Sequence, residues 1–311
     1  MHIVLLCATR RGLRFLEKLR QLCPDDDITV FSFIEDPCEP KYFDDIRQFA
    51  EGHSARFVES KNVSKHWKSI CPIDLVFMVN WRYLVPIEML QPVRLETVVL
   101  HDSLLPNYRG FSPTVWALIN GEDYCGATML CAAESVDSGD IIDQVRVKIG
   151  PEETIADVTE KVTTAYLTML EQNLPLLKAG SATRKPQDHS LATYTCKRVP
   201  EDNLIDWREP AQSTFNLVRA VTHPYPGAYT FYRGAKLIIW SAQANPVIRR
   251  YVGVIPGRVI EIRPNEGVVV LTGEGTLFIR TVQIGDEPET CAADVIKSIA
   301  TTLGSHGAIE R

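Results

Sequence analysis

The chain has 311 residues and a formal net charge of −6, from 33 lysine and arginine residues against 39 aspartate and glutamate residues. Its 45% hydrophobic and 23% charged residues are ordinary for a soluble globular protein that is long enough for two cores. The acidic balance disfavours nucleic acid as a partner. Because no uncharged apolar run reaches about eighteen residues, neither a transmembrane helix nor a membrane partner is expected.

Residues 2–7 form an apolar run without the basic leader of a signal peptide, so we expect a strand there and a cytoplasmic protein. Eight cysteines are scattered without a C-x-x-C pair, which predicts reduced thiols and neither a disulfide framework nor a zinc or other metal site. The residues that follow the strand lack a G-x-G-x-x-G motif, so no dinucleotide site is predicted. Arg10 and Arg11 are expected on a solvated first turn of a helix.

Apolar, β-rich runs alternate with helical patterns as far as about residue 185. Strands are expected at 2–7, 28–34, 74–79, 97–100, 127–131 and 141–149. Helices are expected at 12–22, 41–51, 63–70, 113–120 and 154–177. This alternation is typical of an α/β fold with a doubly wound, mostly parallel, Rossmann-like sheet, to which we assign residues 1–185.

The polar stretch 186–205 contains Pro186 and Pro200 and predicts a linker between domains. Residues 206–311 then form a C-terminal domain. A helix is expected at 213–221, and strands at 227–232, 236–241, 257–262, 267–271 and 276–282. Short strands punctuated by glycine favour a small, open, OB-like β-barrel.

The most informative stretch runs from His101 to Ile142. His101 ends the apolar run 98–100, and open α/β sheets place their ligand crevices at such strand ends. Proline and glycine in the next segment, 104–110, exclude both strand and helix, so the histidine stands beside a fixed loop. Asp137, after the strand at 127–131, has the chemistry to orient the imidazole or exchange protons with it; a solvated turn aspartate is the alternative.

This stretch resembles the 10-formyltetrahydrofolate-dependent formyltransferases. The resemblance lies in His101 with the following SLLPNYRG, Pro113, Trp116, Gly121, Gly126-Ala127-Thr128 and Asp137-Ser138-Gly139. It continues in segments similar to the linker and early C-terminal domain of methionyl-tRNA formyltransferases and of the formyltransferase domains that modify UDP-4-amino-4-deoxy-L-arabinose. These segments are 198–202, 205–207, 216–221 and 224–228. The resemblance implies the same two-domain architecture.

The resemblance implies an enzyme with 10-formyltetrahydrofolate as co-substrate. In the family a histidine and an asparagine address the formyl oxygen, and an aspartate sets the histidine and handles the proton; His101 and Asp137 match two of these. The family pattern is Asn-x-His, but this chain has Val99 two positions before His101, and valine has no donor. Asn80, at the end of the preceding predicted strand, is a candidate replacement. Its alternative is a strand-end asparagine that satisfies local backbone.

Binding residues are assigned by the same resemblance. The folate is expected to contact Arg82, Tyr83, Leu84, Val85, Leu104, Ser138, Gly139, Asp140 and Ile141, largely through the main chain. The substrate is expected to contact Ser103, Tyr108, Arg109, Gly110, Arg198, Asn216 and Arg219. Arg109 suits a carboxylate or phosphate, and Arg198, Asn216 and Arg219 are candidates for a nucleotide diphosphate. For Arg219, an ion pair between domains is an equal alternative.

Three functions remain open. The first is an N-formyltransferase whose partner is a nucleotide-linked amino sugar. The second is a methionyl-tRNA formyltransferase, although the tRNA-acting relatives carry a basic insertion after their first strand where this chain has only Arg10, Arg11 and Arg14. The third is a catalytically weak relative that binds folate or nucleotide, which Val99 favours. The sugar, the base and the position of the amine are not specified by these residues, and a homodimer is left open.

Overall fold

The computed structural model describes residues 1–36, 40–245 and 250–304. They divide into two compact units. Unit 1 comprises Met1–Thr114, Tyr124–Lys148 and Val158–Lys197, and unit 2 comprises Val115–Asp123, Ile149–Asp157 and the chain from Arg198 onward. Two short segments of the N-terminal half therefore group with the C-terminal residues, and the boundaries at 185 and 206 stay a prediction.

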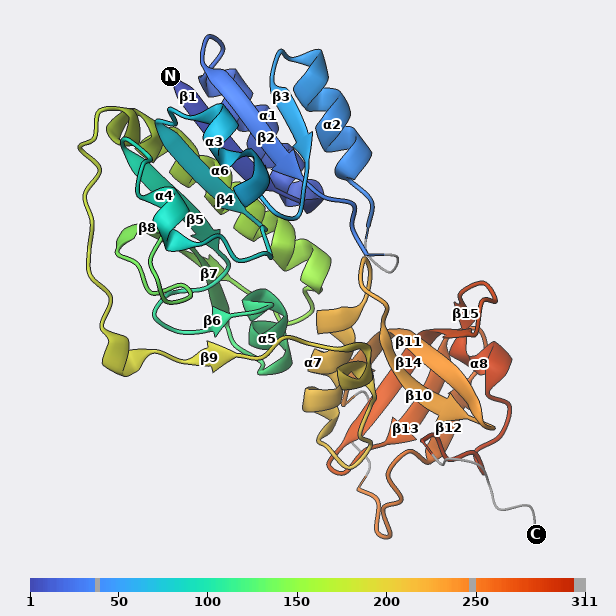
Figure 1. Cartoon of the computed structure of the whole chain (residues 1–311). Helices are drawn as coiled ribbons and strands as arrows, with labels where there is room; N and C mark the ends of the chain where they lie inside the picture. The colour runs from blue at the N-terminus through green and yellow to red at the C-terminus, as the bar shows by residue number, and fades with distance from the viewer. Residues whose placement is uncertain (37–39, 246–249, 305–311) are drawn as a thin grey trace. The chain divides into compact units, whose positions relative to one another are not determined.

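Unit 1 is built on a sheet whose strands, in the described residues, lie in the order β3-β2-β1-β4-β5-β7-β8. The strands are β1 (His2–Cys7), β2 (Asp27–Ser32), β3 (Arg56–Glu59), β4 (Leu75–Val79), β5 (Glu96–His101), β7 (Tyr124–Cys131) and β8 (Ile141–Lys148). The first five strands in this order are parallel, whereas β7 pairs antiparallel with β5, and β8 pairs antiparallel with β7 (Figure 1). The predicted doubly wound, Rossmann-like α/β sheet is confirmed.

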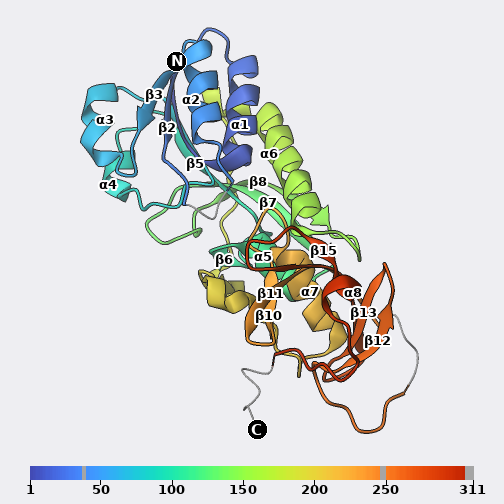
Figure 2. The same cartoon turned by 90° about the vertical axis from the view of Figure 1, so that its right-hand side faces the viewer.

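Helices cover both faces of the parallel strands, which explains why β1 and β4 are almost entirely apolar. The helices of this half are α1 (Thr9–Leu22), α2 (Phe43–Gly52), α3 (Ser64–Ile70), α4 (Ile87–Leu90), α5 (Pro113–Ile119) and α6 (Ile155–Lys178). Figure 2 shows α1 and α6 on one side of the sheet and α3 and α4 on the other. Phe15 of α1 packs on Phe77 of β4, with 5.5 Å between ring centroids. On the opposite face Trp67 and Leu90 join a core with Val76.

Unit 2 contains a second, antiparallel sheet in the order β10-β11-β14-β13-β12, with β15 paired to β14. Its strands are β10 (Ala228–Tyr232), β11 (Ala235–Ala244), β12 (Val259–Arg263), β13 (Gly267–Leu271), β14 (Thr276–Ile284) and β15 (Thr290–Cys291). Helix α7 (Ala211–Val221) packs against β11, and the short α8 (Ala292–Val295) against β13 and β14. The predicted C-terminal strands are confirmed, while closure into an OB-like barrel stays a prediction.

Three short strands of unit 1 were not predicted from the sequence. Edge strand β3 is half-exposed and polar at both ends, so it lacks an apolar pattern. Strands β6 (Arg109–Gly110) and β9 (Tyr194–Thr195) pair in parallel although they lie 85 positions apart, a contact with no local sequence signal. The predicted linker is therefore in part a strand of unit 1.

Seven cysteines fall in the described residues and all are free thiols, whereas Cys38 lies outside them. Burial raises the pKa of Cys125 and Cys131 to about 12, so both stay protonated at neutral pH. Among the described residues, no helix combines the length and the apolar character needed to cross a membrane.

Candidate active site

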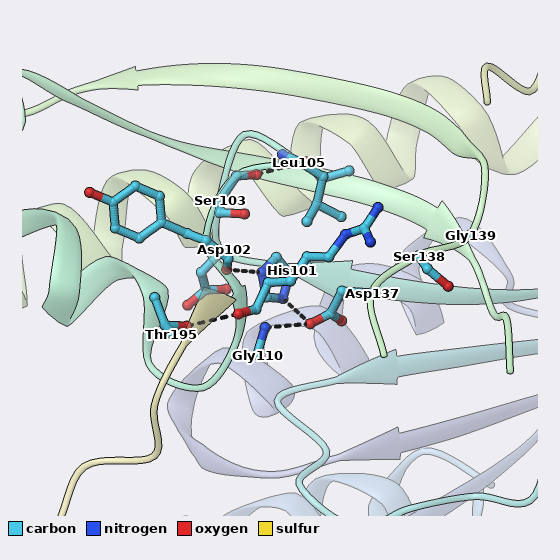
Figure 3. Close-up of polar contacts among 12 residues, drawn as sticks. His101, Asp102, Ser103, Leu105, Gly110, Asp137, Ser138, Gly139 and Thr195 are labelled. Atoms are coloured by element: carbon cyan, nitrogen blue, oxygen red, sulfur yellow. Dashed lines mark hydrogen bonds and ion pairs between the residues drawn. The ribbon is translucent and has the colours of Figure 1, made fainter. Parts of the chain in front are cut away.

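His101 is the last residue of β5 and lies at the carboxyl end of the parallel strands, as predicted. Its Nε2 lies 2.9 Å from the carbonyl oxygen of Tyr108, and its Nδ1 lies 3.4 Å from Oδ2 of Asp137. The side chains of His101 and Asp137 are only 8% and 11% exposed. Figure 3 shows the imidazole and this carboxylate facing each other, so the structure brings the two predicted catalytic residues together.

The two contacts of the imidazole determine where its hydrogens lie. A carbonyl oxygen accepts but never donates, so Nε2 of His101 must carry the hydrogen that it shares with Tyr108. A neutral imidazole then has a bare Nδ1, which repels an ionised carboxylate. Nδ1 therefore faces Oδ2 of Asp137 at a distance over which a shared proton would join the two groups.

Asp137 is held by its turn and by a backbone donor. Its φ of 52° lies in the left-handed region, a strained conformation for a residue other than glycine. Oδ2 accepts a hydrogen bond of 2.9 Å from the backbone N–H of Gly110, whose own φ is 105°. Since strained backbone persists only where its surroundings hold it in place, the position of this carboxylate is enforced rather than incidental.

A buried ion pair lies directly behind the imidazole. Arg11 of α1 donates to Asp102, the residue after His101, at 2.5 Å, and the Tyr166 hydroxyl of α6 donates to the same carboxylate. Thr114 adds a contact of 3.3 Å. Burial alone raises the pKa of Asp102, but Arg11 and Tyr166 outweigh burial and hold this pKa below its ordinary value. The carboxylate therefore stays ionised and ties the histidine strand to two helices.

The expectation that Arg11 is solvated is wrong. Its side chain is only 7% exposed, whereas Arg10 is 60% exposed and pairs with Glu160. Arg11 lies four residues before the buried Phe15, which puts both on the inner face of α1. The spacing from Phe15 was the sequence signal that Arg11 is buried. The carboxylate directly after His101, Asp102, is the group that pairs with Arg11.

Asn80 follows β4 directly, and Val99 lies within β5. The register pairs Val79 with Leu100, so Asn80 is next in line with His101 at the strand ends. The Asn80 amide donates 3.1 Å to the Thr9 hydroxyl. An amide carries two N–H groups, and this contact uses one of them.

The loop after β4 carries the first group of residues predicted to bind folate. The Arg82 guanidinium lies over the ring of Phe33 at 5.1 Å, and Tyr83 packs edge-on against the same ring at 4.8 Å. Val85 packs against the core beneath α3 and α4. Leu84 is 89% exposed. This loop therefore packs through Tyr83 on the Phe33 ring and exposes the apolar side chain of Leu84.

The turn after β7 carries the second group. The Ser138 hydroxyl donates to a backbone carbonyl of the turn at 2.7 Å. A Cβ added to Gly139 would lie 1.8 Å from the carbonyl oxygen of Cys131, so the backbone passes too closely for any other residue. The Asp140 carbonyl accepts from the N–H of Cys131, and Ile141 begins β8. Main-chain contacts thus fix this turn.

The loop between His101 and β6 holds the predicted substrate residues of unit 1. The Ser103 hydroxyl donates 2.6 Å to the carbonyl of Asn107, so it closes the loop on itself. Leu104 packs against Gly126, where an added Cβ would lie 2.5 Å from its side chain. Tyr108 has a φ of 60°, which turns its carbonyl toward the imidazole.

Arg109 is buried, with 3% of its surface exposed. Its Nη2 donates to Oε1 of Gln187 at 2.6 Å and to Nδ1 of His189 at 2.9 Å, and its Nη1 donates to the Tyr194 hydroxyl at 3.4 Å. In this structure the Arg109 guanidinium is hydrogen-bonded to side chains of the protein. Gln187, which the sequence assigned to the linker, is a functional candidate that sequence reasoning missed.

The remaining predicted substrate residues belong to unit 2. Arg198 donates to Oδ1 of Asn203 at 2.8 Å, and the buried Asn216 accepts from Nε of Arg219 at 3.0 Å. Arg219 Nη1 donates to the carbonyl of Gly150 at 3.1 Å. The same guanidinium lines a cavity of about 240 Å³, with Glu152, Thr154, Phe215, Trp240 and Arg280 among its other walls.

Two family matches span most of the chain. Residues 44–174 match the family described as "Formyl transferase". Residues 197–300 match the family described as "Formyl transferase, C-terminal domain". The resemblance drawn from the His101 stretch and from the segments after the linker is thereby confirmed.

Solved structures of similar fold include HypX from Aquifex aeolicus in complex with tetrahydrofolic acid, at TM-score 0.66 and 18% identity. That match covers 96% of this chain but 47% of HypX, so this chain spans about half the length of HypX. An N-formyltransferase from Helicobacter canadensis, in complex with folinic acid and dTDP-3-aminofucose, matches at TM-score 0.67 and 15% identity over 91% of this chain and 99% of its own. Methionyl-tRNA formyltransferase from Clostridium thermocellum matches at TM-score 0.61 and 15% identity, over 92% of this chain and 100% of its own.

Replacing Arg11 by Met should destabilise the protein. The substitution keeps an apolar stem but leaves Asp102 charged and largely buried without its cation, which costs about 3–5 kcal/mol. Chemical denaturation measures the loss. Arg10→Met, on the exposed neighbour, is the matched control and should change the free energy of unfolding by less than about 0.5 kcal/mol. Equal effects of the two variants would contradict a special role for the buried pair.

The lowered pKa of Asp102 predicts an acid-sensitive part of the stability. A carboxylate whose folded pKa lies below its unfolded value of about 3.9 stabilises the protein above that value, and the stabilisation is lost as pH falls through the folded pKa. Asp102→Asn removes this titration. The free energy of unfolding should therefore fall less steeply below about pH 4 in Asp102→Asn than in the wild type. Parallel curves in that range would show that Asp102 has no lowered pKa.

Proposed function

Because the chain belongs to the formyltransferase family, we propose that it transfers a formyl group from 10-formyltetrahydrofolate to the amine of a nucleotide-linked amino sugar. The enzyme class and the co-substrate are those of the family. The single observation that carries the activity is the His101–Asp137 pair at the carboxyl end of the sheet, with a proton position between Nδ1 and Oδ2. A catalytically inactive relative has no need to hold this carboxylate in a strained turn.

Formyl transfer makes and breaks one bond each at the formyl carbon. The neutral amine nitrogen of the acceptor bonds to this carbon, and the carbonyl π pair moves onto oxygen. When that pair returns, the bond to N10 of the folate breaks and its electrons stay on nitrogen. The acceptor nitrogen loses one proton and N10 gains one, so the products are a formamide and tetrahydrofolate. The protein must therefore relay a proton and stabilise a transient oxyanion.

His101 and Asp137 meet the first of these needs. The Tyr108 carbonyl occupies Nε2, so Nδ1 is the imidazole nitrogen that addresses the reacting groups. Asp137 lies beside Nδ1 and accepts the proton that the amine releases. The His101–Asp137 pair returns a proton, through Nδ1 of His101, to N10 of the folate. The Gly110 N–H keeps Oδ2 in place during the exchange.

Asn80 is the residue that we assign to the oxyanion. Val99 has no donor, but the register pairs Val79 with Leu100, and Asn80 follows Val79 as His101 follows Leu100. The amide uses one N–H on Thr9 and has a second for a ligand. A donor from the neighbouring strand thus supports catalysis despite the departure from the family pattern.

The folate segments fit an aromatic ligand. Leu84, in the loop after β4, and Val136, in the turn that carries Asp137, are 89% and 56% exposed. Exposed apolar side chains in both segments suit the faces of a pterin ring. We assign folate binding to these two segments, with Arg82, Tyr83, Val85 and 138–141 as their remaining members, and to Leu104 in the loop between His101 and β6.

A nucleotide-linked sugar is favoured over transfer RNA by charge. A formal net charge of −6 is unfavourable for binding a long polyanion, whereas a diphosphate needs only one or two cations. Arg219 and Arg280 line one cavity in unit 2 beside the Trp240 ring, a combination that suits a phosphate and a flat base. The Helicobacter canadensis structure, solved with dTDP-3-aminofucose, has a similar fold.

Tetrahydrofolate release from 10-formyltetrahydrofolate tests the proposal, with a panel of UDP- and dTDP-linked amino sugars and with methionyl-tRNA as acceptors. Release with an amino sugar and none with the tRNA is the expected result. Formylation of the tRNA alone would move the assignment to the second candidate function. If none of the acceptors on the panel supports tetrahydrofolate release, the proposal is overturned.

His101→Ala should lower kcat by roughly 10²–10⁴-fold, because general acid–base groups contribute on that scale. His53→Ala is the matched control, since His53 is an exposed histidine at the end of α2. Circular dichroism checks that both variants fold. Retention of wild-type kcat in His101→Ala would refute the assignment of the proton relay.

Asn80→Ala should lower kcat by roughly 10²–10³-fold, the usual effect of removing one oxyanion donor. Introducing Val99→Asn into this variant moves the donor to the family position and should restore at least part of the loss. Thr9→Val is the control, because it removes the contact with Asn80 but leaves the amide. If Asn80→Ala and Thr9→Val behave alike, Asn80 is a structural residue and not the donor.

A further inference from the structure

We propose that Gln187 is a positioning residue that holds the Asp137 carboxylate in its catalytic place. The inference rests on the proposed function for its kinetic consequence, but its structural content is independent of the acceptor. Gln187 lies in the stretch that the sequence assigns to a linker, and it is 7% exposed. Such burial is unusual for a glutamine in a connecting segment and requires partners for its amide.

The amide of Gln187 has three partners. Nε2 donates to the carbonyl of Asp137 at 2.9 Å and to the carbonyl of Gly139 at 2.7 Å. Oε1 accepts from Nη2 of Arg109 at 2.6 Å. One side chain thus bridges both ends of the Asp137–Gly139 turn and the strand residue Arg109.

Chemistry fixes the orientation of this amide. Two carbonyl oxygens only accept, so they must face the NH₂ group, and a guanidinium only donates, so it must face the oxygen. Rotating the amide by half a turn would place acceptor against acceptor and donor against donor at all three contacts. Gln187 is therefore locked in one orientation, which suits a side chain that sets the position of another.

The contacts close a ring through the active site. Arg109 holds Gln187, Gln187 holds the backbone of Asp137, and the Asp137 carboxylate accepts from Gly110, the residue next to Arg109. Strands β6 and β9 add backbone pairing, and the Thr195 hydroxyl donates 3.0 Å to the Arg109 carbonyl (Figure 3). Any shift of the turn must break a hydrogen bond in this ring.

The ring also explains how Asp137 keeps a φ of 52°. Without Gln187 the two turn carbonyls lose a buried donor, and the turn is free to relax toward an unstrained conformation. Relaxation moves the carboxylate away from Nδ1 of His101, and misplacement by about 1 Å is enough to slow a reaction on the order of 100-fold. Arg109, buried and bound to Gln187, acts through the same path.

Gln187→Met and Gln187→Glu test the proposal. The first keeps the length but removes every polar contact. The second keeps an acceptor for Arg109 but sets a carboxylate oxygen, which cannot donate, against both turn carbonyls. Both should lower kcat on the order of 100-fold while the KM of each substrate changes by less than about threefold. Asn173→Leu is the matched control, because the amide of Asn173 also donates two hydrogen bonds in unit 1, to Asp143 and Met169.

Hydrogen–deuterium exchange of peptides spanning 107–112 and 135–140 supplies a readout that needs no turnover. Exchange at both should accelerate in the Gln187 variants and stay unchanged in Asn173→Leu. Wild-type exchange in a folded Gln187→Glu overturns the proposal, even if kcat falls. Faster exchange in a protein whose wild type shows no formyl transfer supports the bridge and rejects the proposed function, so the two failures are distinguishable.

Discussion

A carbonyl oxygen accepts hydrogen bonds and never donates them, and the chemistry of this site follows from that constraint. The Tyr108 carbonyl fixes a hydrogen on Nε2 of His101, so Nδ1 is left to face Asp137. Tyr108 and Asp137 both lie in the left-handed backbone region. Both residues that contact the imidazole therefore have strained backbone, which persists only where the surrounding contacts hold it in place.

Two carboxylates near His101 have different surroundings. Asp102 is locked by Arg11 and Tyr166 and has a lowered pKa, so it remains a fixed charge. Asp137 has one backbone N–H donor and the imidazole, with no described cation within ion-pairing distance of its oxygens apart from His101. The proton exchange proposed for Asp137 needs a carboxylate that is not clamped by a guanidinium, and the different surroundings of Asp102 and Asp137 separate the anchoring role from that exchange.

Local patterns made much of the fold predictable. The apolar strands β1 and β4 and the amphipathic α1 depend on neighbours within a few residues, and their predicted ranges agree with the structure to within a few positions. Arg11 was misjudged because its charge was given more weight than its spacing from Phe15. The β6–β9 pairing and the burial of Gln187 join segments far apart in the chain. Local periodicity does not report contacts between distant segments. For this reason the residues assigned to a linker were not predicted to belong to the site.

The register of parallel strands allows a hydrogen-bond donor to be supplied to the same site from a neighbouring strand. In a parallel sheet the last residues of adjacent strands stand side by side, so a group lost within one strand can be supplied by the end of its neighbour. The pairing of Val79 with Leu100 gives Asn80 that place beside His101. The exchange would couple the oxyanion site to folate binding, because the same loop that begins at Asn80 continues into the segment assigned to the pterin.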